Sequence, residues 1–202
     1  RILARKGSIK AETYGILNMY FPVYSYMNAS DQVFSFLSRV ERAIQSGTVG
    51  NSEPLFARWL TDIISGQFED PFSERMPDSS SRGRAASLLG KLGSAEYRPV
   101  LLEAAYGPFD ESLAIGTIHG LSRLGVDETG ETVRAVTELA ERAGSGRPSV
   151  QYAACDALLQ LSRYSSGTVR DDAVRSLTSF SADPWMDPVK KYARKAMEAL
   201  LK

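Results

Sequence analysis

Four segments of the chain repeat one leucine-anchored pattern, and this repeat limits the fold more than any other feature. The segments align on their final leucines, which are Leu92, Leu124, Leu161 and Leu200. Successive anchors lie 32, 37 and 39 residues apart, which is the length of a pair of helices with its turns. The repeat therefore predicts a row of helical hairpins, each burying its apolar side against the next.

Apolar and small residues precede each anchor at the spacing of one helix face. Positions three, four, seven and eleven residues before the anchor fall on one stripe of a helix with 3.6 residues per turn. At the three nearer positions the segments carry Leu89, Leu88 and Ala85; Leu121, Gly120 and Thr117; Leu158, Ala157 and Ala154; and Met197, Ala196 and Ala193. Small residues let neighbouring helices approach closely, so this stripe is predicted to be the buried side of each second helix.

Amphipathic stretches between these segments predict the first helix of each hairpin. They span residues 99–106, 131–142 and 171–180, and turns rich in glycine, serine and proline separate them from the anchored segments. Residues 53–64 are predicted to form the first helix of the first hairpin, with 68–82 as a long polar connector. No segment alternates with period two for long enough to indicate a strand, so the predicted fold class is all-α.

The first anchored segment resembles a known repeat family. Its pattern Ala-Ala-x-Leu-Leu-Gly-x-Leu-Gly, from Ala85 to Gly93, resembles the second helix of HEAT-like repeats, the short armadillo-like form of bacterial repeat proteins and phycobilisome lyases. The third segment matches nearly as well, while the second departs at Thr117 and Gly120, and the fourth has Met197 and no closing glycine. The resemblance covers about residues 53–202 and implies a right-handed α-solenoid of about four HEAT-like helical hairpins, spanning residues 51–202.

The first 50 residues differ from the repeats and are predicted to form an N-terminal helical cap. Residues 9–21 and 30–44 read as two helices, and Ser30 and Asp31 are favourable residues at a helix start. This region is rich in aromatic residues. They indicate either a capping bundle or a docking surface, and both interpretations stay open.

The side of each second helix opposite the buried stripe is predicted to face solvent. It lies nine, five and two residues before each anchor and holds Gly83, Ser87 and Gly90; Ile115, His119 and Ser122; Tyr152, Asp156 and Leu159; and Lys191, Lys195 and Glu198. Ile115, Tyr152 and Leu159 are apolar where water is expected, which is typical of an interaction site. Packing within the chain is the alternative. The candidate partner-binding residues are Ile115, His119, Tyr152, Asp156, Leu159, Lys191 and Lys195.

No residue pattern predicts catalysis, a metal or a cofactor. Ser87, His119 and Asp156 share one column of the alignment, but equivalent positions on packed helices lie roughly 8–10 Å apart, too far for a nucleophile to contact its base. Cys155, the single cysteine, is expected to be a small buried apolar residue. The acidic pairs that begin at Asp127 and Asp171 lack the spacing of a calcium loop. We therefore expect no enzyme.

The charge balance limits the class of partner. Acidic and basic residues number 24 each, so no overall positive field attracts nucleic acid or an anionic membrane. Lys190, Lys191, Arg194 and Lys195 form a local basic cluster, which is weak evidence for nucleic acid on its own. No apolar run is long enough to span a membrane. The expected partner is a protein or peptide bound along the second helices.

Two other functions and the compartment stay open. The family resemblance implies a lyase or chaperone-like protein of the phycobilisome-lyase type, which would need a tetrapyrrole or another apolar cofactor. A structural spacer within a longer chain is the further alternative. The cytoplasm is the default location, and a periplasmic or exported one stays open because the sequence begins at Arg1 rather than Met.

Overall fold

The described part of the chain is entirely helical. The computed structural model describes residues 29–67, 77–125 and 127–200, and these contain nine α-helices, two short 3₁₀ turns and no strand. The helices are α2 (Ala29–Gln45), α3 (Glu53–Ser65), α4 (Ser79–Leu92), α5 (Arg98–Tyr106), α6 (Glu111–Leu124), α7 (Glu131–Ala143), α8 (Pro148–Tyr164), α9 (Gly167–Phe180) and α10 (Asp187–Glu198). The predicted all-α class is therefore confirmed.

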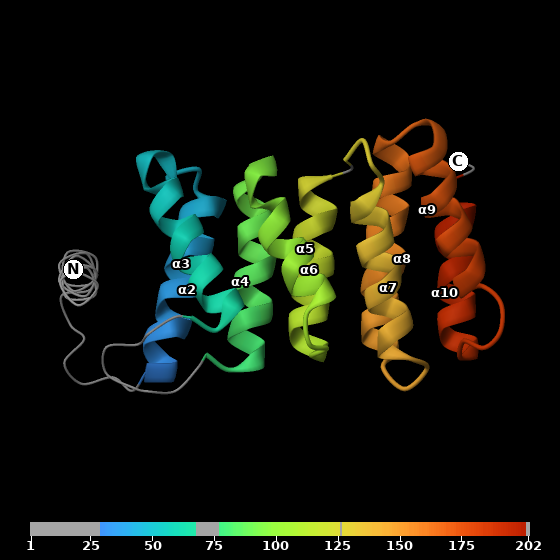
Figure 1. Cartoon of the computed structure of the whole chain (residues 1–202), viewed down its shortest axis with the longest axis horizontal. Helices are drawn as coiled ribbons and strands as arrows, with labels where there is room; N and C mark the ends of the chain where they lie inside the picture. The colour runs from blue at the N-terminus through green and yellow to red at the C-terminus, as the bar shows by residue number, and fades with distance from the viewer. Residues whose placement is uncertain (1–28, 68–76, 126, 201–202) are drawn as a thin grey trace, which may run out of the picture.

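The helices form two rows that run in chain order. Helices α2, α4, α6, α8 and α10 contact one another in succession, and α3, α5, α7 and α9 form a second row against them. Figure 1 shows the helices side by side along the long axis of the molecule, from α2 at one end to α10 at the other. We call the first set the even row.

The predicted helices occur close to their predicted positions. The four anchored segments lie in α4, α6, α8 and α10, and the amphipathic stretches between them lie in α5, α7 and α9. The connector predicted at 68–82 is wrong at its end, because α4 already begins at Ser79. The carboxylate of Asp78 accepts a hydrogen bond of 2.7 Å from the Ser81 backbone N–H and caps the helix there. The predicted helix at 9–21 lies outside the described residues.

The predicted buried stripe forms the core of the even row. Leu89, Leu121 and Leu158, each three residues before its anchor, are fully buried, as are the small residues seven before it. The anchors Leu92, Leu124 and Leu200 themselves are only partly buried, and Leu161 alone of the four is fully covered. The repeat thus marks the correct face, but the leucine used to find it lies at the edge of that face.

Helices α4 and α6 touch backbone to backbone, and they share the most extensive helix contact of the fold. A Cβ atom built on Gly116 would overlap the carbonyl group of Gly83, and one built on Gly90 would overlap the backbone of Gly120. At Gly120 a Cβ would lie 2.6 Å from the Ala86 carbonyl oxygen. Only glycine lacks the atom that would prevent this approach. These four glycines therefore set the separation of the two helices.

Asp127 fixes the start of α7. Its carboxylate accepts backbone N–H hydrogen bonds from Glu131 at 3.0 Å and from Thr132 at 2.8 Å, and the hydroxyls of Thr129 and Thr132 also donate to it. Partial burial raises the pKa of Asp127, but the hydrogen bonds outweigh that effect and hold the pKa well below the ordinary value of 3.8. The ionised carboxylate thus satisfies donors that a helix start leaves unpaired.

We expect Gly116→Ala to destabilise the protein by about 2 kcal/mol or more, because its Cβ would overlap the α4 backbone. The sign is diagnostic, since glycine to alanine within an ordinary helix is stabilising by up to about 1 kcal/mol. Urea unfolding followed by circular dichroism gives the free energy. Gly146→Ala is the control, because a Cβ atom added at that position would meet open space. Equal stability of Gly116→Ala and the parent would contradict the backbone contact.

Removing the carboxylate with Asp127→Ala should cost about 1–2 kcal/mol at neutral pH. The pKa of Asp127 is lower in the folded state than in the unfolded state, where it is near 3.8. The carboxylate therefore stabilises the fold fully above pH 3.8, and this stabilisation is lost as the pH falls through the folded-state pKa. The parent should therefore lose its advantage over the variant below about pH 4. Urea unfolding across this range measures the difference. The control is Glu128→Ala, because Glu128 is exposed and does not cap the helix. An equal loss of unfolding free energy in Glu128→Ala and Asp127→Ala would contradict the capping role of Asp127.

Candidate functional site

The outward side of the even row is narrower than the sequence predicts. Gly83, Gly90 and Ser122 were expected to face solvent, but all three are buried. The positions nine and two residues before each anchor lie toward the next helix of the row, as the Gly83 and Gly90 contacts with α6 show. The positions five and twelve before the anchor point outward instead, and on α6 and α8 so does the position one before it.

Larger side chains fill the successive contacts of the even row. Between α4 and α6 the contact is glycine against glycine. Between α6 and α8, the Ser122 hydroxyl donates a 2.9 Å hydrogen bond to the side-chain oxygen of Gln160. Between α8 and α10, two tyrosine rings meet. From α4 to α10 the side chains between successive helices therefore become larger, and the α8–α10 contact is the one made by two aromatic rings.

Tyr152 and Tyr192 form the aromatic part of the candidate site. Their ring centroids lie 4.9 Å apart at an interplanar angle of 52°, which is a favourable tilted arrangement. The Tyr192 hydroxyl donates a 2.8 Å hydrogen bond to the Asp156 carboxylate, and this bond raises the pKa of Tyr192. Both rings are half-buried. The pair is therefore held in place and still offers aromatic surface to a partner.

His119 lies on the neighbouring helix α6 and is exposed. Partial desolvation of the imidazole and the positive charge of Arg123 lower the pKa of His119, while the negative charge of Asp156 acts in the opposite direction. The imidazole is consequently mainly neutral at pH 7. These couplings show that residues of α6 and α8 belong to one electrostatic neighbourhood.

Exposed cations lie on α6 and α10, the two helices of the row on either side of α8. Arg123, Lys191 and Lys195 are exposed, and none of the three forms an ion pair within the described residues. We define the α6–α8–α10 face by these cations and their neighbours: His119, Arg123, Tyr152, Asp156, Lys191, Tyr192 and Lys195. This face combines exposed positive charge with a fixed aromatic pair.

The seven predicted partner-binding residues have different environments. His119, Asp156, Lys191 and Lys195 are exposed, and Tyr152 is half-buried against Tyr192. Ile115 and Leu159 were expected to be exposed apolar residues. Both are partly buried and pack against the core, which agrees with the alternative of packing within the chain. They lie on the side of α6 and α8 that faces the next helix of the row.

Arg123 and Tyr192 belong to this face and were missed from the sequence. Arg123 lies one residue before the anchor Leu124, and Tyr192 lies eight before Leu200. A wider outward sector, centred on the position five before the anchor, would have included Arg123. Tyr192 could not be found in this way, because its equivalent on α6 is the buried Gly116.

The described residues offer little for catalytic or metal chemistry. The Cys155 side chain is fully buried, and this burial raises the pKa of its thiol to about 12, which leaves it unreactive. No group of three histidine, cysteine, aspartate or glutamate side chains within the described ranges is placed to hold a metal ion. The Asp156 carboxylate is engaged by Tyr192 rather than placed to orient a base. Among the helices that the structure describes, none has the length and apolarity to cross a membrane.

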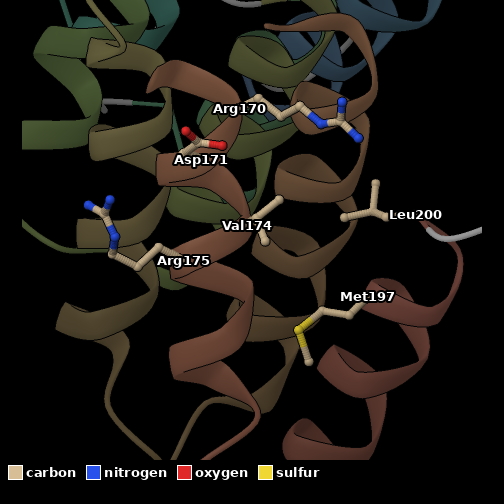
Figure 2. A pocket seen from close by; sticks show the side chains of 6 residues that line it. All are labelled: Arg170, Asp171, Val174, Arg175, Met197 and Leu200. Carbon is tan, nitrogen blue, oxygen red and sulfur yellow. The ribbon is translucent and has the colours of Figure 1, made fainter. Parts of the chain in front are cut away.

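A hollow lies between α9 and the end of α10. Figure 2 shows the side chains of Val174, Met197 and Leu200 around one gap, with the Arg175 side chain directed away from it. The hollow is lined by three apolar side chains, two arginines and one aspartate. It holds no aromatic ring and no histidine, so it offers fewer recognition groups than the α6–α8–α10 face.

Comparison with known proteins adds one distant relative. No protein-family model matches the chain, and no solved structure matches it. The chain is 30% identical over 168 residues to an uncharacterized protein of Treponema pallidum (strain Nichols). The match covers 82% of this chain and 31% of that protein, so the chain spans about a third of the relative's length.

His119 allows a direct test of the face, because it is the single histidine of the chain and gives one imidazole resonance. We expect Arg123→Gln to raise the pKa of His119, since a repelling charge is lost. Asp156→Asn should lower it, since an attracting charge is lost. A proton NMR titration of each variant measures both shifts. Shifts in the same direction, or no shift in either variant, would contradict the arrangement of α6 and α8.

Proposed function

We propose that this chain is a HEAT-like solenoid domain that binds a protein or peptide on the α6–α8–α10 face. The repeated hairpins, the two rows of helices and the small-residue stripe support the solenoid interpretation. In such arrays each repeat contacts its neighbours, and the exposed row of helices is free for a partner. The domain would then be an accessory or scaffold part of a longer protein, and it would have no catalytic role.

The observation that carries this proposal is the Tyr152–Tyr192 pair on a face with exposed charged residues. Tyrosine is enriched at the centres of interfaces, because it offers a large rigid contact area and a hydroxyl at low entropic cost. Here the pair is already fixed by ring contact and by the Asp156 hydrogen bond. A fixed anchor binds more tightly than a mobile one, since less freedom is lost on binding.

The chemistry of the described side chains favours binding over catalysis. The buried thiol is protonated, and the single histidine is coupled to charges without a nucleophile placed against it. A general base needs its proton donor within hydrogen-bond reach. The polar groups of the face are instead spread over three helices, as recognition of an extended partner requires.

Site-directed photocrosslinking in the full-length protein, in cells of its own organism, tests the proposal. A benzoylphenylalanine side chain is placed at exposed His119 or Lys195 on the face. Matched controls carry it at exposed Glu103 of α5 or Glu138 of α7, on the other row. We expect the same partner to be crosslinked from both face positions and from neither control.

Two results would contradict a binding role for this face. Adducts that form only at Glu103 and Glu138 would place the interaction on the other row. Absence of any adduct at all four positions, with the protein folded, would favour a spacer role for the domain.

A further inference from the structure

The charges of the α6–α8–α10 face indicate the chemistry of its partner. Arg123 on α6 and Lys191 and Lys195 on α10 are exposed and unpaired within the described residues. On the α2 side of the row, by contrast, Arg84 and Lys91 both pair with Glu41, at 2.8 and 2.9 Å. On α4 the two cations are therefore already paired with a carboxylate, whereas those of α6 and α10 named above are not.

The acids of the same surface do not cancel these charges. The Asp156 carboxylate accepts the Tyr192 hydroxyl and lies between the tyrosines and His119. Glu198 is exposed near the C-terminal end of α10, one helical turn from Lys195. These two acids against three cations leave the surface with a net positive charge, and no ion pair joins either acid to those cations.

We infer that the α6–α8–α10 face binds an acidic, extended peptide segment that carries an aromatic side chain. Its carboxylates would pair with Arg123, Lys191 and Lys195, and its aromatic ring would pack on the Tyr152–Tyr192 pair. This inference rests on the proposed function and specifies the partner of the same site.

The geometry sets the length of this segment. Neighbouring packed helices lie about 8–10 Å apart, so the cations of α6 and α10 are separated by about 20 Å across α8. An extended chain covers about 3.3 Å per residue. A segment of about six residues therefore reaches from Arg123 to the lysines, with its aromatic residue between the middle and the end that contacts α10.

Single-stranded nucleic acid has the same two chemical features, negative charge and stackable rings. The acidic peptide is favoured because Asp156 lies at the centre of the face, where a continuous line of phosphates would approach it. A peptide can place its carboxylates at the two sides and a neutral aromatic residue opposite Asp156. A nucleic acid cannot vary its charge in this way.

Fluorescence anisotropy with defined probes tests the inference on the folded protein. The acidic probe is a labelled dodecapeptide of glutamate with phenylalanine at every third position. The matched probes replace every glutamate by lysine, or every phenylalanine by alanine, and a single-stranded DNA dodecamer is the fourth. We expect the acidic probe to bind best, the lysine probe not to bind, and the alanine probe to bind several-fold more weakly.

Charge reversal then locates the binding site. The Lys191→Glu/Lys195→Glu variant should bind the acidic probe about tenfold or more weakly, because like charges now oppose it. The control Arg58→Glu/Arg134→Glu changes two exposed arginines on α3 and α7 by the same net charge and should bind as the parent does. Added salt should weaken binding by the parent.

Several outcomes would overturn the inference. These are equal binding of the acidic and lysine probes, tighter binding of the DNA, equal losses in the two double variants, or no binding of the acidic probe at millimolar concentration. If crosslinking from His119 and Lys195 still captures one partner, only the chemistry assigned to that partner is wrong. If crosslinking also fails at these positions, the proposed function fails as well.

Discussion

The backbone contact of α4 with α6 is the constraint on which the rest of the even row depends. Gly83, Gly90, Gly116 and Gly120 leave no side-chain atom between the two helices, so their separation is fixed by the backbones themselves. A contact of this kind tolerates little change, because interiors are closely packed and a single added carbon must displace the backbone. It also closes the surface between α4 and α6, where the sequence alone places an exposed column.

Beyond α6 the same positions carry larger side chains, and the surface changes accordingly. Ser122 and Gln160 join α6 to α8 through a hydrogen bond, and Tyr152 and Tyr192 join α8 to α10 through their rings. One repeated position is thus used for close approach at one end of the row and for an aromatic pair at the other. The candidate site follows from this progression, since its rings are the contacts between helices and are also partly exposed.

The pairing of charged residues also differs between the two ends of the row. On the α2 side, Glu41 pairs with Arg84 and Lys91 and lowers the charge available there. Toward α10 the carboxylate of Asp156 is taken up by a tyrosine hydroxyl, and the neighbouring cations have no such partner. The face is therefore positive although the whole chain has equal numbers of acidic and basic residues. The net charge of the chain conceals this local excess, because it is summed over all residues regardless of where they lie.

The sequence by itself determined the helices, their order and their buried side, because a 3.6-residue period and turn-forming residues are local properties. It located α4 to α10 to within a few residues, apart from the early start of α4 at Ser79. Only the tertiary structure decided which flank of each helix meets its neighbour. With the helices turned in this way, Gly83, Gly90 and Ser122 are buried, and Ile115 and Leu159 pack against the core. The same rotation places Arg123 and Tyr192 on the α6–α8–α10 face. A helix has the same period whichever way it is turned, and its rotation is set by the helices that pack on both sides.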